Sequence, residues 1–257
     1  MDLQNNTILI TGGSGGIGFE LAKRLSALGN IVIATGRSQA ALDKARQAIP
    51  SLRTIQSDAA DPEAIAHLYE QVVREFPRLN VLINNAGIMR KINVQHFEGD
   101  LRDATSEIDT DLSGPIRMVM QFLPHLLAQP NGAILNVSSG LAFIPFAISP
   151  VYSAAKAGVR AFTRALRVQL KHTNVKVFEL APPVVDTPLN DVFKEDLGGV
   201  KLMDVAALGA AAIDGLRNDR FEIRPGLANV MKIMSRVAPE HMLNQLGKSA
   251  ERMTAAV

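Results

Sequence analysis

The stretch TGGSGGIG, from Thr11 to Gly18, follows the apolar run TILIT (7–11) and opens the amphipathic run GFELAKRLSALG (18–29). A short apolar run before a glycine cluster is typical of a buried strand, and the segment after it has the spacing of a helix. Glycines at such a junction permit a tight turn and let a pyrophosphate approach the N–H groups that begin the helix. A glycine-rich turn alone could be a flexible loop, but its place between strand and helix favours dinucleotide binding.

Short apolar runs alternate with longer amphipathic segments along the rest of the chain. The apolar runs are continuous, which is typical of parallel strands buried on both faces. This pattern predicts one α/β domain over residues 1–257, a doubly wound Rossmann fold with a mostly parallel sheet of about seven strands flanked by helices. Strands are expected at 7–11, 31–35, 52–56, 79–84, 133–139, 175–181 and 221–224, and helices at 18–29, 39–49, 61–76, in one long stretch ending near 128, and at 150–171, 204–217 and about 227–257.

Composition excludes several classes of function. The chain has no cysteine, which rules out disulfides and cysteine-ligated metals, and its five histidines lack metal-site spacing, so we expect no metal. The formal net charge is +2 and no dense basic run contains aromatic residues, so nucleic acid is not an expected partner. No apolar run is long enough to span a membrane and the first residues lack a secretory pattern. We expect a cytoplasmic protein that does not bind membranes.

The end of the second predicted strand, IATGRS, indicates which dinucleotide is bound. An acidic residue there would hydrogen-bond the adenosine ribose hydroxyls and favour NAD, but this chain has Gly36 and Arg37. A guanidinium can pair with a 2′-phosphate. The sequence therefore predicts a preference for NADP over NAD, unless Arg37 merely starts the next segment.

The stretch VYSAAKAGV (151–159) contains one of only two tyrosines in the chain. Tyr152 and Lys156 lie four residues apart, so on a helix they share a face. A free phenol has a pKa near ~10, and a neighbouring ammonium stabilises the phenolate and lowers that pKa. The pair could be an acid with the cation that tunes it, or two residues on an exposed face.

These motifs together resemble the short-chain dehydrogenase/reductase family. TGGSGGIG, NNAG (84–87) and a serine followed by YxxxK occur in the family's order over residues 7 to 190. The stretches NVSSGLAF and ELAPPVVDT resemble the DltE-like oxidoreductases within it. The resemblance implies an NADP(H)-dependent enzyme that interconverts a carbonyl and an alcohol.

The resemblance also implies roles for individual residues. Tyr152 would be the acid in reduction and the base in oxidation, Lys156 would tune it and bind the nicotinamide ribose, and Ser139, rather than the neighbouring Ser138, would hold the substrate oxygen. Asp58 would contact the adenine, and Thr187 the nicotinamide carboxamide. The complete expected cofactor set is Gly12, Ser14, Gly16, Ile17, Gly18, Arg37, Asp58, Asn85, Ala86, Gly87, Tyr152, Lys156, Pro182, Val185 and Thr187.

Two positions depart from the family pattern. Asp111 stands where the family usually has an asparagine whose backbone carbonyl holds a water that connects to the lysine. We expect Asp111 still to serve this proton relay as a catalytic residue. Pro183 replaces a common glycine, and its fixed φ should stiffen the loop beside the nicotinamide.

The sequence says less about the substrate and the partner chains than about the cofactor. The apolar segment 140–150, Met89 and the variable segment about 188–203 are candidate walls of a cleft for a small hydrophobic carbonyl or alcohol, although the first could equally be core. The helix at 153–171 is too apolar for one buried stripe, which predicts a homodimer or homotetramer. Alternatives to a reductase are a dinucleotide-binding sensor or structural protein with little activity, and an epimerase or dehydratase.

Overall fold

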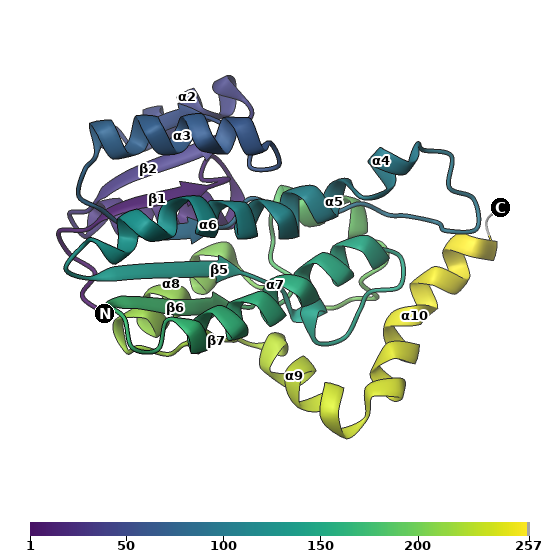
Figure 1. Ribbon diagram of the computed structural model, residues 1–257. Helices are drawn as coiled ribbons and strands as arrows, with labels where there is room; N and C mark the ends of the chain where they lie inside the picture. The colour runs from purple at the N-terminus through teal and green to yellow at the C-terminus, as the bar shows by residue number, and fades with distance from the viewer. Residues whose placement is uncertain (256–257) are drawn as a thin grey trace.

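A computed structural model describes residues 1–255, and a parallel sheet of seven strands forms the centre of this part of the chain (Figure 1). The strand order is β3-β2-β1-β4-β5-β6-β7, and every neighbouring pair is parallel. The order reverses between β1 and β4, which places a crevice at the carboxyl ends of these strands. The strands are β1 Thr7–Thr11, β2 Ile31–Gly36, β3 Arg53–Gln56, β4 Leu79–Asn84, β5 Gly132–Val137, β6 Val175–Leu180 and β7 Glu222–Ile223.

Both faces of the sheet are covered, as the continuous apolar strands predict. On β1, Ile8 and Ile10 pack into the core on one face and Leu9 packs into the core on the other. The first core receives residues from α1 (Gly16–Ala27), α2 (Gln39–Ala48) and α8 (Val205–Arg217). The second receives residues from α3 (Pro62–Glu75), α6 (Gly114–Leu127) and α7 (Pro150–Gln169).

Most predicted elements agree with the structure to within two or three residues, and the Rossmann-type fold is confirmed. Local chemistry explains several helix starts: Asp61 caps α3 by accepting from the Glu63 N–H at 2.8 Å, and Pro62 takes the first helical position. Strand β5 ends at Val137, two residues before the predicted end.

The single long helical stretch expected before residue 128 is wrong. Residues 85–100 form no helix, and α4 (Leu101–Ala104), α5 (Ser106–Ile108) and a π-helical turn (Asp109–Ser113) precede α6. Pro115 has no N–H to give to the carbonyl of Asp111 four residues earlier, so the regular α-helical bond cannot form there. The break places Asp111 at an irregular turn.

Two helices extend beyond the last strand, α9 (Leu227–Val237) and α10 (Pro239–Ala255), and form an arm in Figure 1. Residues Leu246, Ala250 and Met253 of α10 pack against a small core formed by Phe146, Ile148 and Phe193. Phe193 lies in a short 3-10 helix, η3 (Pro188–Phe193), within the predicted variable loop. Among residues 1–255, no helix is both long and apolar enough to cross a membrane.

Candidate functional site

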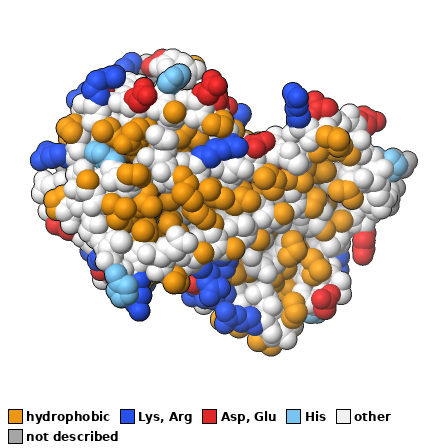
Figure 2. Space-filling model, viewed as in Figure 1, with side chains coloured by type: hydrophobic (Ala, Val, Ile, Leu, Met, Phe, Trp, Pro, Cys, Tyr) orange, Lys and Arg blue, Asp and Glu red, His pale blue; other side chains and the backbone are white. Residues whose placement is uncertain are grey.

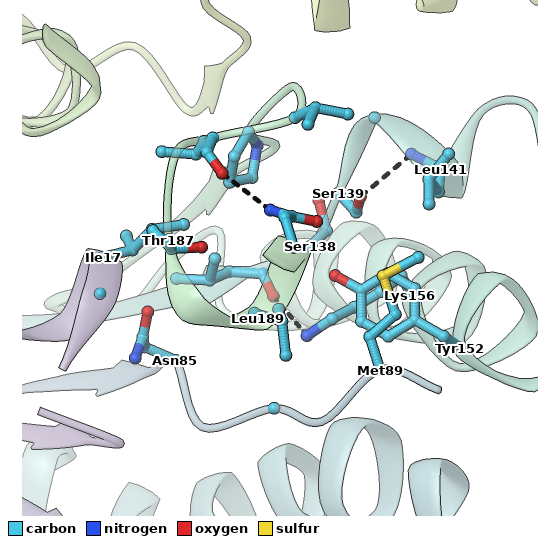
Figure 3. A pocket seen from close by; sticks show the side chains of 18 of the residues that line it. Ile17, Asn85, Met89, Ser138, Ser139, Leu141, Tyr152, Lys156, Thr187 and Leu189 are labelled. Atoms are coloured by element: carbon cyan, nitrogen blue, oxygen red, sulfur yellow. Dashed lines mark hydrogen bonds between the residues drawn. The ribbon is translucent and has the colours of Figure 1, made fainter. Parts of the chain in front are cut away.

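A cavity of about 340 Å³ lies at the carboxyl ends of the central strands (Figure 3). It brings together residues from segments that are far apart in the sequence. Its lining includes the predicted residues Gly12, Gly16, Ile17, Asn85, Ala86, Gly87, Ser139, Tyr152, Lys156, Pro182, Val185 and Thr187.

The glycine loop packs so closely that side chains would not fit at Gly12, Gly13 or Gly18. Gly12 has a φ of +65°, and a Cβ there would lie 2.9 Å from the Ala86 Cα. A Cβ on Gly18 would lie 2.4 Å from the Asn85 Nδ2, so this third glycine is explained by packing. By contrast, a Cβ on Gly15 would meet no atom of residues 1–255 within 4 Å, and none of their side chains caps the start of α1. This open, uncapped helix start fits a pyrophosphate.

Hydrogen bonds hold the segment after β4 against the glycine loop. Thr11 Oγ1 accepts from the N–H groups of Asn85 and Ala86, each at 3.0 Å. The Asn85 side-chain amide donates to the carbonyls of Thr11 at 3.0 Å and Gly12 at 3.2 Å. The NNAG segment therefore fixes the shape of the loop that would hold the cofactor.

A second hollow, beside the first, has the residues expected around an adenosine group. It is lined by Ser14, Arg37, Ser38 and Asp58, together with Gly12 and Ala86 of the first cavity. Asp58 Oδ1 accepts from the Ala60 N–H at 2.9 Å, which orients the carboxylate. The two hollows together fit an extended dinucleotide.

Tyr152 and Lys156 lie on the first turns of α7 and are both buried at the floor of the cavity, so they are not an exposed pair. Lys156 Nζ lies 5.5 Å from the centre of the Tyr152 ring and donates to the Val137 carbonyl at 3.2 Å. Burial raises the pKa of Tyr152, and the Asp111 carboxylate raises it further. The Lys156 ammonium lowers this pKa. The hydroxyl of Ser139 lowers the same pKa.

Asp111 does not line either cavity but lies directly beneath Lys156. Its Oδ1 accepts from the Ile88 N–H at 2.8 Å, and its Oδ2 lies 3.4 Å from Lys156 Nζ. Burial raises the pKa of Asp111. Burial lowers the pKa of Lys156, but Asp111 and Tyr152 together raise it by more, so the net shift is upward. The contact with the lysine is therefore made by the Asp111 side chain.

The two serines after β5 face different neighbours. Ser138 is buried and its hydroxyl donates to Glu179 Oε1 at 2.6 Å. Ser139 has an extended backbone, and its Oγ accepts from the Leu141 N–H at 3.1 Å (Figure 3). Ser139 is thus the serine without a carboxylate partner in the described chain, which agrees with its predicted role.

The expected substrate walls are corrected in part. Ile144, Phe146 and Ile148 of the segment 140–150 are buried core residues, and Gly140 and Leu141 are its contribution to the cavity. Apolar residue type alone does not separate core from cleft. Met89 and Leu189 line the cavity as expected.

Pro183, Val184 and Met231 also line the cavity and were not anticipated as substrate walls, whereas Asn190 belongs to the expected segment 188–203. Met231 comes from α9, and its sulfur would lie 2.9 Å from a Cβ placed on Gly140. No sequence signal linked this helix to the serine loop, because the contact joins residues some ninety positions apart.

Comparison with known proteins agrees with this geometry. The family model described as short chain dehydrogenase matches residues 6–198. The chain is 42% identical over 250 residues to the uncharacterized oxidoreductase DltE of Bacillus subtilis (strain 168), covering 96% of this chain and 98% of that protein.

Two solved structures share the fold. A short chain dehydrogenase from Burkholderia cenocepacia J2315 in complex with NADP has a TM-score of 0.83 at 23% identity, covering 96% of this chain and 99% of that one. A short chain dehydrogenase/reductase from Burkholderia phymatum in complex with NAD has a TM-score of 0.80 at 19% identity, covering 90% and 93%. The chain belongs to the short-chain dehydrogenase family and is a pyridine-nucleotide-dependent oxidoreductase.

Proposed function

We propose that the protein is an NADP(H)-dependent reductase that interconverts an uncharged, apolar ketone or aldehyde with its alcohol. The observation that carries this proposal is the convergence of Ser139, Tyr152 and Lys156 on one cavity beside the glycine loop. NADPH, when bound, supplies the hydride. The remaining requirement is a proton at the carbonyl oxygen, and the chain has a buried phenol in the cavity to give it.

The three side chains have separate tasks in this proposal. Tyr152 gives its proton to the carbonyl oxygen in reduction and accepts it back in oxidation. Lys156 stabilises the phenolate that remains, and it would also bind the nicotinamide ribose. Ser139 donates a hydrogen bond to the same oxygen and holds it beside the phenol. Thr187 and Val185, at the opposite wall, would hold the nicotinamide.

The cavity lining supports an uncharged substrate. Among the described residues, Lys156 is the one charged side chain that lines the cavity, and it is already held by Asp111 and Val137. A carboxylate or phosphate on the substrate would therefore lose water without gaining a free cation. The apolar wall is formed by Met89, Leu141, Leu189 and Met231.

The preference for NADP rests on Arg37 in the adenosine hollow. Arg37 lines this hollow together with Ser14 and Ser38, and no carboxylate follows β2 where NAD-selective proteins carry one. The structural neighbours include one complex with NADP and one with NAD, so the residue, and not the fold, supports the preference.

The test is a panel of carbonyl compounds incubated with the purified protein and NADPH, with turnover followed by the absorbance of the reduced nicotinamide. Apolar aldehydes and ketones should be reduced, and matched compounds with a carboxylate in place of the terminal methyl should be reduced more slowly. If the carboxylates are the better substrates, the proposed substrate class is wrong.

A dinucleotide sensor is the second candidate, because Asp111 gives Lys156 a carboxylate partner that the family's usual asparagine would not. A sensor would bind NADPH with high affinity and turn over no member of the panel. The two functions therefore separate in the same experiment.

Replacing Asp111 with asparagine is expected to lower the pH at which alcohol oxidation becomes active, since the carboxylate raises the pKa of Tyr152. Oxidation needs the phenolate, so a lower pKa makes that form available at lower pH. The measurement is the pH profile of kcat/KM for an alcohol that the panel identifies. Asp109 is an exposed carboxylate in the same turn, so Asp109→Asn should leave the pH profile of oxidation unchanged. If kcat/KM for oxidation rises at the same pH or a higher pH in Asp111→Asn, the carboxylate does not act on the phenol.

We infer a homodimer or homotetramer that pairs α6 and α7. Figure 2 shows hydrophobic side chains gathered over these two helices. Met120 of α6 is 62% exposed and Val168 of α7 is 74% exposed. Light scattering should give a multiple of the chain mass, and Val168→Glu should lower it toward one chain because a charge would be buried at the contact. A wild-type mass of one chain would exclude this arrangement.

A further inference from the structure

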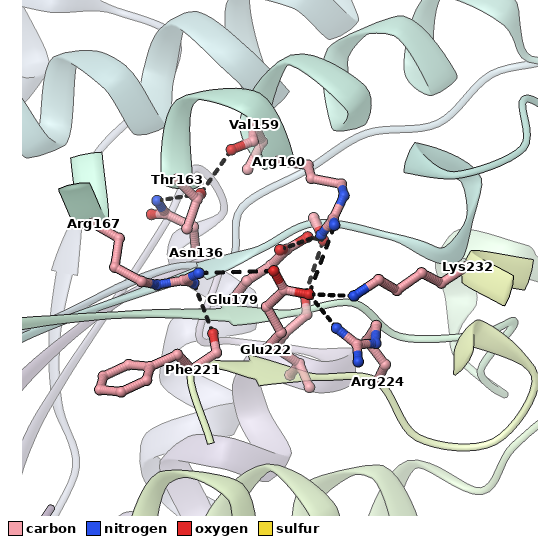
Figure 4. Close-up of polar contacts among 12 residues, drawn as sticks. Asn136, Val159, Arg160, Thr163, Arg167, Glu179, Phe221, Glu222, Arg224 and Lys232 are labelled. Carbon is pink, nitrogen blue, oxygen red and sulfur yellow. Dashed lines mark hydrogen bonds and ion pairs between the residues drawn. The ribbon is translucent and has the colours of Figure 1, made fainter. Parts of the chain in front are cut away.

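A buried carboxylate lies behind the predicted substrate-holding serine. Glu179, on β6, has no exposed surface, and both of its oxygens are engaged. Oε1 accepts from the Ser138 hydroxyl at 2.6 Å. Oε2 accepts from Arg160, also at 2.6 Å, and Figure 4 shows Arg160 reaching Glu179. Burying a charge costs several kcal/mol unless its partners compensate, so an apolar residue at this position of a strand would be the simpler solution for stability alone.

Backbone hydrogen bonds on both sides of Ser139 couple its position to that of Ser138. Ser138 N–H donates to the Leu180 carbonyl at 2.8 Å, and Gly140 N–H donates to the Pro182 carbonyl at 2.7 Å. These bonds continue the β5–β6 ladder past the end of β5, so Ser139 lies between two tethered residues. Successive side chains on extended backbone point to opposite sides. A Ser138 hydroxyl held by Glu179 therefore fixes the direction of the Ser139 hydroxyl.

The other side of Glu179 is held by a set of charged residues around Glu222 (Figure 4). Arg160 extends from Glu179 to Glu222 at 3.7 Å, and its guanidinium lies 4.4 Å from the centre of the Phe143 ring. Lys232 of α9 donates to Glu222 at 2.9 Å, and Arg224 and Arg167 also pair with it. Glu222 thus has the same chemistry and shares Arg160, but it has no contact with Ser138 among the bonds described.

We propose that Glu179 is a positioning residue for carbonyl reduction, acting through Ser138 to aim the Ser139 hydroxyl into the cavity. This inference rests on the proposed function, in which Ser139 holds the substrate oxygen. It assigns the buried ion pair a role beyond joining α7 to the sheet, and it explains why a second serine precedes Ser139.

The test compares six variants by steady-state kinetics and thermal unfolding: Glu179→Leu, Glu179→Gln, Ser138→Ala, Ser139→Ala, Glu222→Leu and the double variant Ser138→Ala/Glu179→Leu. Glu179→Leu and Ser138→Ala should each lower kcat about tenfold with little change in the KM for NADPH, because a small displacement of a group on the reacting oxygen costs rate. The double variant should lose no more than either single variant. Glu179→Gln keeps an acceptor for Ser138 and should retain most of the wild-type kcat.

A purely structural role predicts a different pattern. In that case both Glu179 variants and Glu222→Leu would lower the unfolding temperature together, and kcat measured well below that temperature would stay at the wild-type value. The pH profile gives a second readout, since a displaced Ser139 no longer lowers the pKa of Tyr152 and the oxidation limb should move upward in Ser138→Ala but not in Glu222→Leu.

The outcomes separate this inference from the proposed function. Loss of turnover in Ser139→Ala with unchanged kcat in Ser138→Ala would overturn the positioning role and leave the reductase intact. Ser138→Ala is a small change, so this result does not depend on whether the Glu179 variants fold. No turnover by the wild type would overturn the proposed function and the inference with it. Full turnover by Ser139→Ala would leave the reductase intact but remove Ser139 from the chemistry, which also overturns the positioning role of Glu179.

Discussion

Replacing Tyr152 with phenylalanine is expected to lower kcat for carbonyl reduction by about 10²- to 10⁴-fold, the range that removal of a positioned general acid costs. The change deletes one oxygen and keeps the buried ring beside Lys156, so the cavity should keep its shape. NADPH affinity, measured by the fluorescence of the reduced nicotinamide, should weaken by no more than about tenfold, since one ribose hydrogen bond is worth about 0.5–1.5 kcal/mol in net terms and about 1.4 kcal/mol is a factor of ten.

The other tyrosine of the chain provides a matched control for this variant. Tyr69 is the second of two tyrosines, and it packs edge-on against Phe122 in the core, with ring centres 5.2 Å apart. Tyr69→Phe should leave kcat and NADPH affinity at wild-type values. Equal turnover in Tyr152→Phe and Tyr69→Phe would remove Tyr152 from the chemistry, and the proton would then have to come from another group or from water.

Replacing Arg37 with leucine is expected to lower kcat/KM for NADPH about 10- to 100-fold and to leave kcat/KM for NADH within about twofold. A hydrogen bond to a charged group is worth about 1.5–3 kcal/mol, and NADH lacks the 2′-phosphate that would receive it. The measurement is the ratio of the two efficiencies on one substrate, which cancels any shared change in the site.

The matched control for Arg37 is Arg46→Leu. Arg46 lies on α2, the helix that follows Arg37, and pairs with the exposed Asp43. Arg46→Leu should leave the ratio unchanged. If Arg37→Leu lowers both efficiencies equally, Arg37 contacts a part that the two dinucleotides share. If the wild-type ratio already favours NADH, the predicted preference is wrong whatever Arg37 contacts.

The parts of the fold that sequence predicts well are those that local chemistry specifies. The apolar run 7–11, the glycine turn after it and the Asp61–Pro62 cap each carry their own signal, and each lies where expected. The order of motifs along the chain indicated where the two hollows lie, because the carboxyl ends of parallel strands meet at one edge of the sheet.

The parts that sequence missed depend on contacts between distant segments. Phe146 and Ile148 have the composition of a substrate wall, yet Phe193 and α10 cover them. Met231 lines the cavity because α9 returns to Gly140. The ion pair between Asp111 and Lys156 required knowledge of where the π-helical turn places a side chain. None of these contacts follows from spacing along the chain.

The most direct test of the central claim is transfer of a label from cofactor to substrate. NADPH carrying deuterium at its transferable position would be incubated with the wild type and with Tyr152→Phe, using the best carbonyl compound of the panel, and the product examined by mass spectrometry and NMR. We predict that the wild type forms an alcohol with deuterium on the former carbonyl carbon, and that Tyr152→Phe forms almost none while still binding NADPH. NADPH bound by the wild type with no deuterium in any product would contradict the account and favour a dinucleotide sensor.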